Sequence, residues 1–129
     1  MLASDPNFSG IISSAKTQVD VLVVSFHWGV EYKPHTDRQA KLAHTAIDNG
    51  ADIIVGAHPH VAQDLETYKD KLIMYSLGNF VFDQYFSKET MQGLVVRTTA
   101  TKDPSTGAIT ITNTKEYINK LDKNFTIES

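Results

Sequence analysis

The sequence carries a nearly continuous apolar run, Val19-Asp20-Val21-Leu22-Val23-Val24-Ser25-Phe26, in which most side chains are β-branched or aromatic. This pattern is typical of a strand that is buried on both faces, as the strands of parallel sheets are. A second, shorter run of the same kind follows at Asp52-Ile53-Ile54-Val55-Gly56. The two runs predict neighbouring parallel strands.

The segment between the two runs predicts a helix. Thr36 and Gln39 have the spacing of a capping box, and an apolar stripe then continues to Asn49-Gly50, a typical helix end. We therefore expect a helix over 37–49 and a right-handed strand–helix–strand unit. An earlier helix over 7–18 is predicted by four apolar residues at helical spacing: Phe8, Ile11, Ile12 and Ala15.

The second half of the chain predicts two antiparallel hairpins. Residues 61–68 and 72–76 flank a first polar turn, and residues 94–101 and 108–117 flank the turn Asp103-Pro104-Ser105-Thr106-Gly107. The predicted fold class is therefore α/β (α+β), a βαβ unit followed by two antiparallel hairpins, with both helices on one face of a sheet. Since there is no internal repeat or linker, we expect residues 1–129 to form a single unit.

Composition excludes several classes of function. The chain has 129 residues, 41% of them hydrophobic and 21% charged, a net charge of −3 and no cysteine. Scattered basic residues and a negative charge argue against nucleic acid as the main partner. The lack of cysteine excludes disulfides, thiolate metal sites and cysteine nucleophiles. No stretch approaches the roughly 20 apolar residues of a membrane span, and the first residues show no signal-peptide pattern.

Histidines follow both predicted strands at the point where each strand ends. His27 comes after the first strand, and His58 and His60 come after the second. The carboxyl ends of adjacent parallel strands meet at one edge of a sheet, so these side chains should converge. We therefore expect His27, His58 and His60 to bind one divalent metal ion, with Zn, Mn and Fe as the candidates.

Other residues near these strand ends have two interpretations each. Glu31 is a catalytic acid/base candidate together with His60, although it also fits a metal ligand, a partner of His27 or a solvated loop carboxylate. Trp28 is either a substrate-binding wall of the cleft or an edge of the core. Asn79, which follows Gly78 after a strand, either binds metal or a substrate oxygen or stabilises its own turn.

Four further residues have simpler expectations. Phe80 and Phe82 are expected in the core. His35, in a loop, and His44, on the second helix, are expected to be surface or hydrogen-bonding residues rather than ligands.

Three segments together resemble a known family. Ser25-Phe26-His27-Trp28-Gly29-Val30-Glu31-Tyr32, Gly56-Ala57-His58-Pro59-His60-Val61 and Tyr75-Ser76-Leu77-Gly78-Asn79-Phe80-Val81-Phe82-Asp83 occur in the order and spacing of the bacterial capsule-synthesis family of the CapA/PgsA type. That family is associated with poly-γ-glutamate capsules and belongs to the calcineurin-like metallophosphatase superfamily. The resemblance covers about residues 12–82.

The resemblance implies part of an α-β-β-α sandwich with a metal-type site at its strand ends. His27 resembles the isolated late histidine of the metallophosphatase pattern, and residues 56–60 resemble its terminal Gly-His-x-His element with Ala57 inserted. Glu31, Asn79 and Asp83 match positions typical of the capsule family. An early strand bearing an Asp, which the superfamily has, is missing before Ser4, so the chain resembles the C-terminal half of the domain.

Two functions follow from the resemblance. The first is metal-dependent hydrolysis of a phosphoester or a γ-glutamyl amide, and the alternative is a non-catalytic polymer-binding or assembly module of a capsule synthase. The implied partners are an anionic polymer or a small-molecule substrate and other capsule-synthesis subunits. The family implies a membrane-anchored protein at the outer face of the bacterial cell. With half of a sandwich missing, the chain should self-associate unless another segment covers it.

Overall fold

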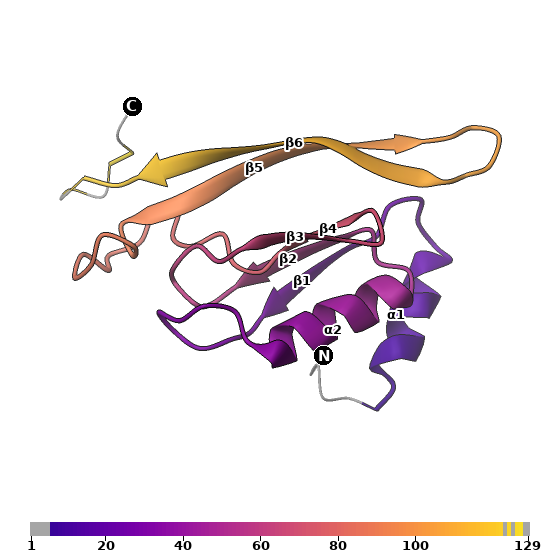
Figure 1. Cartoon of the computed structure of the whole chain (residues 1–129), viewed down its shortest axis with the longest axis horizontal. Helices are drawn as coiled ribbons and strands as arrows, with labels where there is room; N and C mark the ends of the chain where they lie inside the picture. The colour runs from indigo at the N-terminus through magenta and orange to yellow at the C-terminus, as the bar shows by residue number, and fades with distance from the viewer. Residues whose placement is uncertain (1–5, 123, 125, 128–129) are drawn as a thin grey trace.

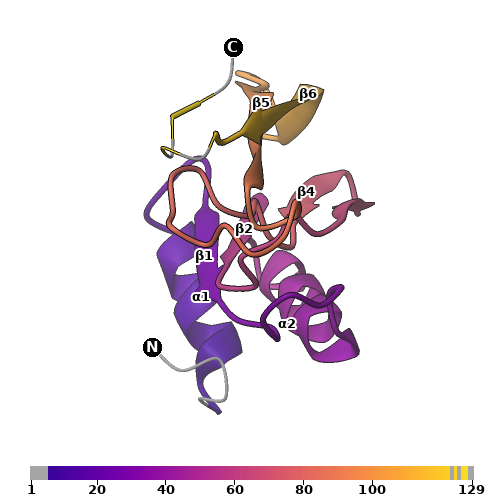
Figure 2. The same cartoon turned by 90° about the vertical axis from the view of Figure 1, so that its left-hand side faces the viewer.

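The computed structural model of the chain describes residues 6–122, 124, 126 and 127. These residues form three layers, with two helices on one side of a four-stranded sheet and a long two-stranded hairpin on the other (Figures 1 and 2). The elements are α1 (Phe8–Lys16), β1 (Val23–His27), α2 (Asp37–Asp48), β2 (Ile53–Ala57), β3 (Leu65–Tyr68), β4 (Lys71–Met74), β5 (Gln92–Lys102) and β6 (Ile109–Lys120).

The strand pairing confirms the predicted parallel pair and the two antiparallel hairpins. β1 pairs in parallel with β2 from Val23↔Ile53 to His27↔Ala57. β3–β4 and β5–β6 are the two antiparallel hairpins. β4 adds to the sheet in parallel beside β2, which gives the strand order β1-β2-β4-β3.

Helix α2 begins where its capping box predicts. The Thr36 hydroxyl accepts a hydrogen bond from the Gln39 backbone N–H, and the Gln39 side-chain oxygen accepts one from the Thr36 backbone N–H at 3.0 Å. α1 and α2 bury one face each against the sheet, where they form a core with the apolar residues Phe8, Ile12, Phe26, Trp28, Ala43, Ala46, Ile47, Ile54, Ile73 and Tyr75. Burial of this face stabilises the helix pair more than intrinsic helix propensity does.

The expectation that the first strand is buried on both faces is wrong. Phe26 is buried on the helix side of β1, but Val23 is 52% exposed. Alternate residues of a strand point to opposite faces, so Val23 lies on the side where the hairpin packs. The hairpin covers β2 and β4 there, through contacts of Val96 and Ile111 with Ile53, Leu72 and Met74. β1 lies at the edge of the sheet, beyond this contact.

Asp52 joins three elements at the amino end of the sheet. Its carboxylate is buried and accepts hydrogen bonds from Lys16 at 2.6 Å, from Lys71 at 2.7 Å and from the Leu22 backbone N–H at 2.9 Å. Burial alone raises the pKa of this carboxyl, but the three hydrogen bonds outweigh it and hold the pKa of Asp52 below its ordinary value. Asp52 therefore stabilises the fold as an anion.

Replacing Asp52 with asparagine should lower the free energy of unfolding by about 3 kcal/mol at pH 7, because a buried ion pair loses one partner. The folded-state pKa is depressed, so this contribution is present above the unfolded pKa of about 4 and is lost as the pH falls toward the folded value. Urea unfolding should therefore show a smaller difference from wild type at pH 3 than at pH 7.

Asp48→Asn is the matched control. Asp48 pairs with Lys69 at 2.6 Å, but both side chains are exposed, at 41% and 62%. An exposed pair of this kind contributes about 0–1 kcal/mol. Equal losses of stability in the two variants would contradict the role assigned to Asp52.

Candidate metal centre

The ends of β1 and β2 leave the sheet at the same edge and stay together beyond it. The Trp28 N–H donates to the Ala57 carbonyl at 3.1 Å, and the Tyr32 N–H donates to the Pro59 carbonyl at 2.8 Å. The loop after β1 and the loop after β2 are therefore fixed against each other. This pairing brings the polar residues of both loops to one place, as the parallel topology predicts.

Glu31, His58 and His60 form the candidate metal centre. Each offers one ligand atom, and these atoms all lie within 4.8 Å of one another. Glu31 is exposed, while both histidines are half-buried. Two imidazoles and one carboxylate form a donor set that leaves open coordination positions and suits Zn²⁺, Fe²⁺ or Mn²⁺.

His27 lies beside this group rather than in it. Its ring centroid is 4.6 Å from that of His58, with the rings tilted by 42°. The sequence grouped His27 with His58 and His60, whereas the structure groups Glu31 with them. Of the alternatives for Glu31, the metal-ligand interpretation agrees best with this geometry.

The backbone of the second loop turns sharply on both sides of Pro59. His58 has φ +102° and His60 has φ +59°, values that residues other than glycine rarely adopt. Such conformations cost of order 1–3 kcal/mol each and occur mainly where function requires a particular side-chain direction. Here they direct the two histidines of the centre.

Asn79 fixes the tautomer of His60. The Asn79 amide nitrogen donates to the Thr90 carbonyl at 2.9 Å, which can only accept, so the amide oxygen must face His60. That oxygen lies 3.0 Å from His60 Nδ1, which therefore carries the proton. His60 Nε2 is left with its lone pair available for a metal ion, as in the outer-shell arrangement of many metal-bound histidines.

Asn79→Leu should lower Zn²⁺ affinity by about 10- to 100-fold, because His60 loses the acceptor that orients its ring. Asn79→Asp keeps an oxygen toward Nδ1 and should retain most of the affinity. Calorimetric titration at pH 7.5 measures both variants. Wild-type affinity in the leucine variant would contradict this role of Asn79.

Trp28 packs as an edge of the core, the second of its two interpretations. Its side chain is 8% exposed and stacks on Phe26, with ring centroids 4.3 Å apart. Its indole N–H donates to the Tyr75 carbonyl at 2.8 Å. Contact with a substrate would have to use the small exposed part of Trp28.

Aromatic side chains surround the rim of the candidate metal centre. The ring of His60 stacks on Phe82 with centroids 5.1 Å apart, and Tyr32 contacts Phe86 edge to face at 5.1 Å. The expectation that Phe80 and Phe82 belong to the core is wrong, since they are 57% and 43% exposed. They follow Asn79 in a loop that leaves the sheet.

His44 has the hydrogen-bonding role expected of it, away from the centre. Its Nε2 lies 2.8 Å from Glu66, whose other oxygen accepts a hydrogen bond from the Tyr75 hydroxyl at 2.5 Å. Burial and the neighbouring Glu66 raise the pKa of Tyr75. The ring of His35 stacks on the ring of Tyr75, with centroids 4.1 Å apart. These residues connect α2 to the sheet.

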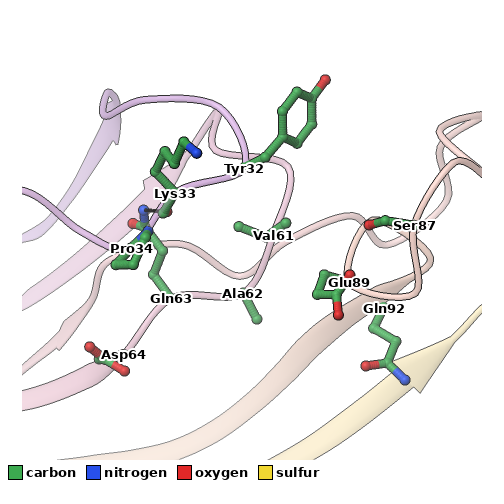
Figure 3. A pocket seen from close by; sticks show the side chains of 10 residues that line it. All are labelled: Tyr32, Lys33, Pro34, Val61, Ala62, Gln63, Asp64, Ser87, Glu89 and Gln92. Atoms are coloured by element: carbon green, nitrogen blue, oxygen red, sulfur yellow. Dashed lines mark hydrogen bonds between the residues drawn. The ribbon is translucent and has the colours of Figure 1, made fainter.

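A cavity of about 540 Å³ lies between the loops that follow β1 and β2 and the segment that leads into β5 (Figure 3). We call it the side cavity. It is lined by Tyr32, Lys33, Pro34, Val61, Ala62, Gln63, Asp64, Ser87, Glu89 and Gln92. Tyr32 and Val61 follow directly after Glu31 and His60 in the sequence, so the side cavity and the centre are built on the same two loops.

Comparison with known proteins places this architecture in a family. The sequence profile of the bacterial capsule synthesis protein PGA_cap matches residues 3–84, more than half of the chain. The chain is 50% identical over 97 residues to the PGA biosynthesis protein CapA of Bacillus subtilis, covering 74% of this chain and 26% of that protein. It is 52% identical over 82 residues to the capsule biosynthesis protein CapA of Bacillus anthracis, covering 62% of this chain and 20% of that protein.

A more distant relative is a probable polyglutamine synthesis accessory protein of Mycobacterium tuberculosis, 35% identical over 65 residues, which cover 50% of this chain and 17% of that protein. The chain therefore spans only about a fifth to a quarter of the two CapA proteins. None of the helices in the described residues has the length and apolar character needed to cross a membrane. By the match over residues 3–84, the chain belongs to the bacterial capsule synthesis protein family PGA_cap.

Proposed function

We propose that this chain carries the metal-binding centre of a hydrolase that acts on a capsule polymer. The observation that supports this proposal is the convergence of Glu31, His58 and His60 from two loops, with His60 oriented by the buried side chain of Asn79. A structural role alone does not require two histidines in left-handed backbone conformations beside an exposed carboxylate. The donor set and the exposed position both fit a catalytic ion.

The chemistry would be addition of water across an amide or ester bond. A bound ion would supply Lewis acidity and a more acidic water. One oxygen of the exposed Glu31 carboxylate would hold the ion with His58 and His60, and its second oxygen would accept a proton from the attacking water. His27, beside His58, would deliver a proton to the leaving group. The hydroxyl of water ends on the carbonyl carbon or phosphorus, and its proton ends on the leaving amine or alcohol.

A γ-glutamyl amide is the substrate that we favour over a phosphoester. The relative from Bacillus subtilis is named for PGA biosynthesis, which agrees with a glutamate polymer as substrate.

Hydrolysis of poly-γ-glutamate by the Zn²⁺- or Mn²⁺-loaded protein tests this function, with released amino groups as the readout. Glu31→Gln should reduce the rate at least about 100-fold. Glu116→Gln, an exposed change on β6, should not. Polymer binding without any hydrolysis would instead support the alternative, a non-catalytic polymer-binding or assembly module.

We also propose that residues 1–129 are one part of a larger protein that works with other capsule-synthesis subunits at the outer face of the cell. The support is the partial coverage of the relatives and the uncovered side of β1. Protease accessibility of the protein in intact cells tests its location.

On its own, the chain should self-associate. β1 is an edge strand, Val23 is 52% exposed, and Ile118 on β6 is 65% exposed. The described residues therefore expose apolar side chains on both sheets and an unpaired strand edge. Sedimentation velocity should show dimers or larger species at micromolar concentration. A monomer at all concentrations would contradict this expectation.

A further inference from the structure

We propose that the side cavity binds the free amino end of a peptide-like chain, recognising its ammonium and a carboxylate together. This inference rests on the proposed function, because it assigns the substrate a position beside the candidate metal centre. A ligand of this class carries opposite charges a short distance apart. The side cavity offers the complementary arrangement on two opposing walls.

The walls come from different parts of the chain (Figure 3). Lys33 and Pro34 form one side, Ser87, Glu89 and Gln92 form the other, and Val61 and Ala62 lie between them. The ammonium of Lys33 and the carboxylate of Glu89 are therefore separated by the cavity. A zwitterionic end can place its carboxylate toward Lys33 and its ammonium toward Glu89.

The balance of charge favours an amino end over an internal polymer segment. Two carboxylates, Asp64 and Glu89, line the cavity beside the single ammonium of Lys33. Hydrogen bonds from its own backbone N–H and from Ser87 hold the pKa of Glu89 below its ordinary value, so it is ionised at neutral pH. An internal segment of a polyanion would bring only further carboxylates against these two, whereas an amino end also brings an ammonium that can compensate Glu89.

The base of the side cavity is held in place before any ligand binds. Gln63 is buried, and its amide nitrogen donates to the Lys33 carbonyl at 2.8 Å. Its amide oxygen accepts from Gln39 at 2.9 Å, and its backbone N–H donates to the Ser76 carbonyl at 2.9 Å. A preformed site avoids the cost of ordering loops on binding.

Tyr32 connects the side cavity to the candidate metal centre. Its ring centroid is 6.2 Å from that of His60, and its hydroxyl accepts a hydrogen bond from Gln84 at 3.0 Å. A polymer whose amino end is bound in the side cavity would extend past Tyr32 toward Glu31 and His60. The scissile bond would then lie near the end of the polymer, which makes the site exo-acting.

Binding of two small probes tests this assignment in the presence of a chelator. The probes are γ-glutamylglutamate with a free amino group and the same dipeptide with an acetylated amino group. Calorimetry or NMR titration of the wild-type protein should show binding of the free dipeptide that is at least about tenfold tighter, since acetylation removes the charge paired with Glu89. Equal affinity for the two, or no binding of either, would overturn the proposal.

Variants of the lining residues test which groups recognise the free amino group and the carboxylate of the probe. Glu89→Gln should remove the difference between the two probes, and Lys33→Met should weaken both. Glu116→Gln, on β6, is the control and should leave both affinities unchanged. An unchanged preference for the free amine in Glu89→Gln would also overturn the proposal.

Metal titration separates this inference from the proposed function. Glu89→Gln should bind Zn²⁺ with wild-type affinity, since Glu89 does not belong to the centre. A protein that binds Zn²⁺ and hydrolyses the polymer but does not distinguish the probes would retain the proposed function without this inference. A protein that discriminates between the probes but binds no metal would contradict the proposed function and leave this inference intact.

Discussion

Replacing His58 with alanine should reduce the affinity of the chain for Zn²⁺ or Mn²⁺ by about 100-fold or more. The variant removes one of three ligand atoms that lie within 4.8 Å of one another, whereas loss of an outer-shell partner alone costs about 10- to 100-fold. The alanine also replaces a residue at φ +102°, so the variant loses the ligand and keeps an unfavourable backbone conformation. Calorimetric titration of the metal-free protein measures the effect.

Two other histidines provide controls of different kinds. His44→Ala should leave metal affinity unchanged, because His44 is bonded to Glu66 between α2 and β3. His27→Ala distinguishes the grouping expected from the sequence from the grouping in the structure. If Glu31 is the third ligand, His27→Ala should cost less than about tenfold and Glu31→Ala about 100-fold. Equal metal affinity in the wild type and in His58→Ala would contradict the assignment of this metal centre.

Much of the fold could be predicted because its signals are local. The capping box at Thr36 and Gln39 fixes the start of α2, and the two apolar runs predict the parallel pair β1 and β2. The exposure of Val23 could not be predicted from the run that contains it, because exposure depends on which strands the distant β5–β6 hairpin covers. Hydrophobicity alone predicts Phe80 and Phe82 in the core, because it does not reveal that their loop leaves the sheet and exposes them.

Strand topology alone predicts only part of the candidate site. Parallel pairing of β1 and β2 is enough to bring His27 close to His58. The selection of Glu31 instead of His27 depends on the path of the loop after β1, where Tyr32 adopts φ +61° and bonds to Pro59. Such a conformation has no recognisable sequence signal in a residue other than glycine.

The role of Thr90 cannot be predicted from the sequence for a similar reason. Its buried carbonyl accepts the hydrogen bond that orients Asn79, eleven residues earlier in the chain. Nothing in the sequence near Thr90 distinguishes it from other threonines, since what matters is a main-chain oxygen placed by the fold. The sequence singles out Asn79 as a candidate, but its hydrogen bond with His60 depends on tertiary structure.

Replacing Gly56 with alanine should destabilise the protein by about 3 kcal/mol or more and lower the melting temperature by roughly 10 °C. Gly56 lies in β2 where the indole of Trp28 crosses the strand to reach the Tyr75 carbonyl. A Cβ at this position would overlap Tyr75 O and Trp28 Nε1 and would lie 2.7 Å from the Tyr75 carbonyl carbon. Neither the backbone of residue 75 nor the packed indole can move aside without breaking their hydrogen bond, which leaves a buried N–H unpaired.

Gly10→Ala is the matched control, because the same substitution should there be neutral or stabilising. A Cβ on Gly10 in α1 would meet Asn7 Oδ1 at 2.6 Å, but that atom ends a flexible side chain, and alanine favours a helix by up to about 1 kcal/mol over glycine. Thermal and urea unfolding measure both variants. If Gly56→Ala melts at the wild-type temperature, Trp28 does not hold the strand end that leads to His58, and the position of that ligand must depend on the loop alone.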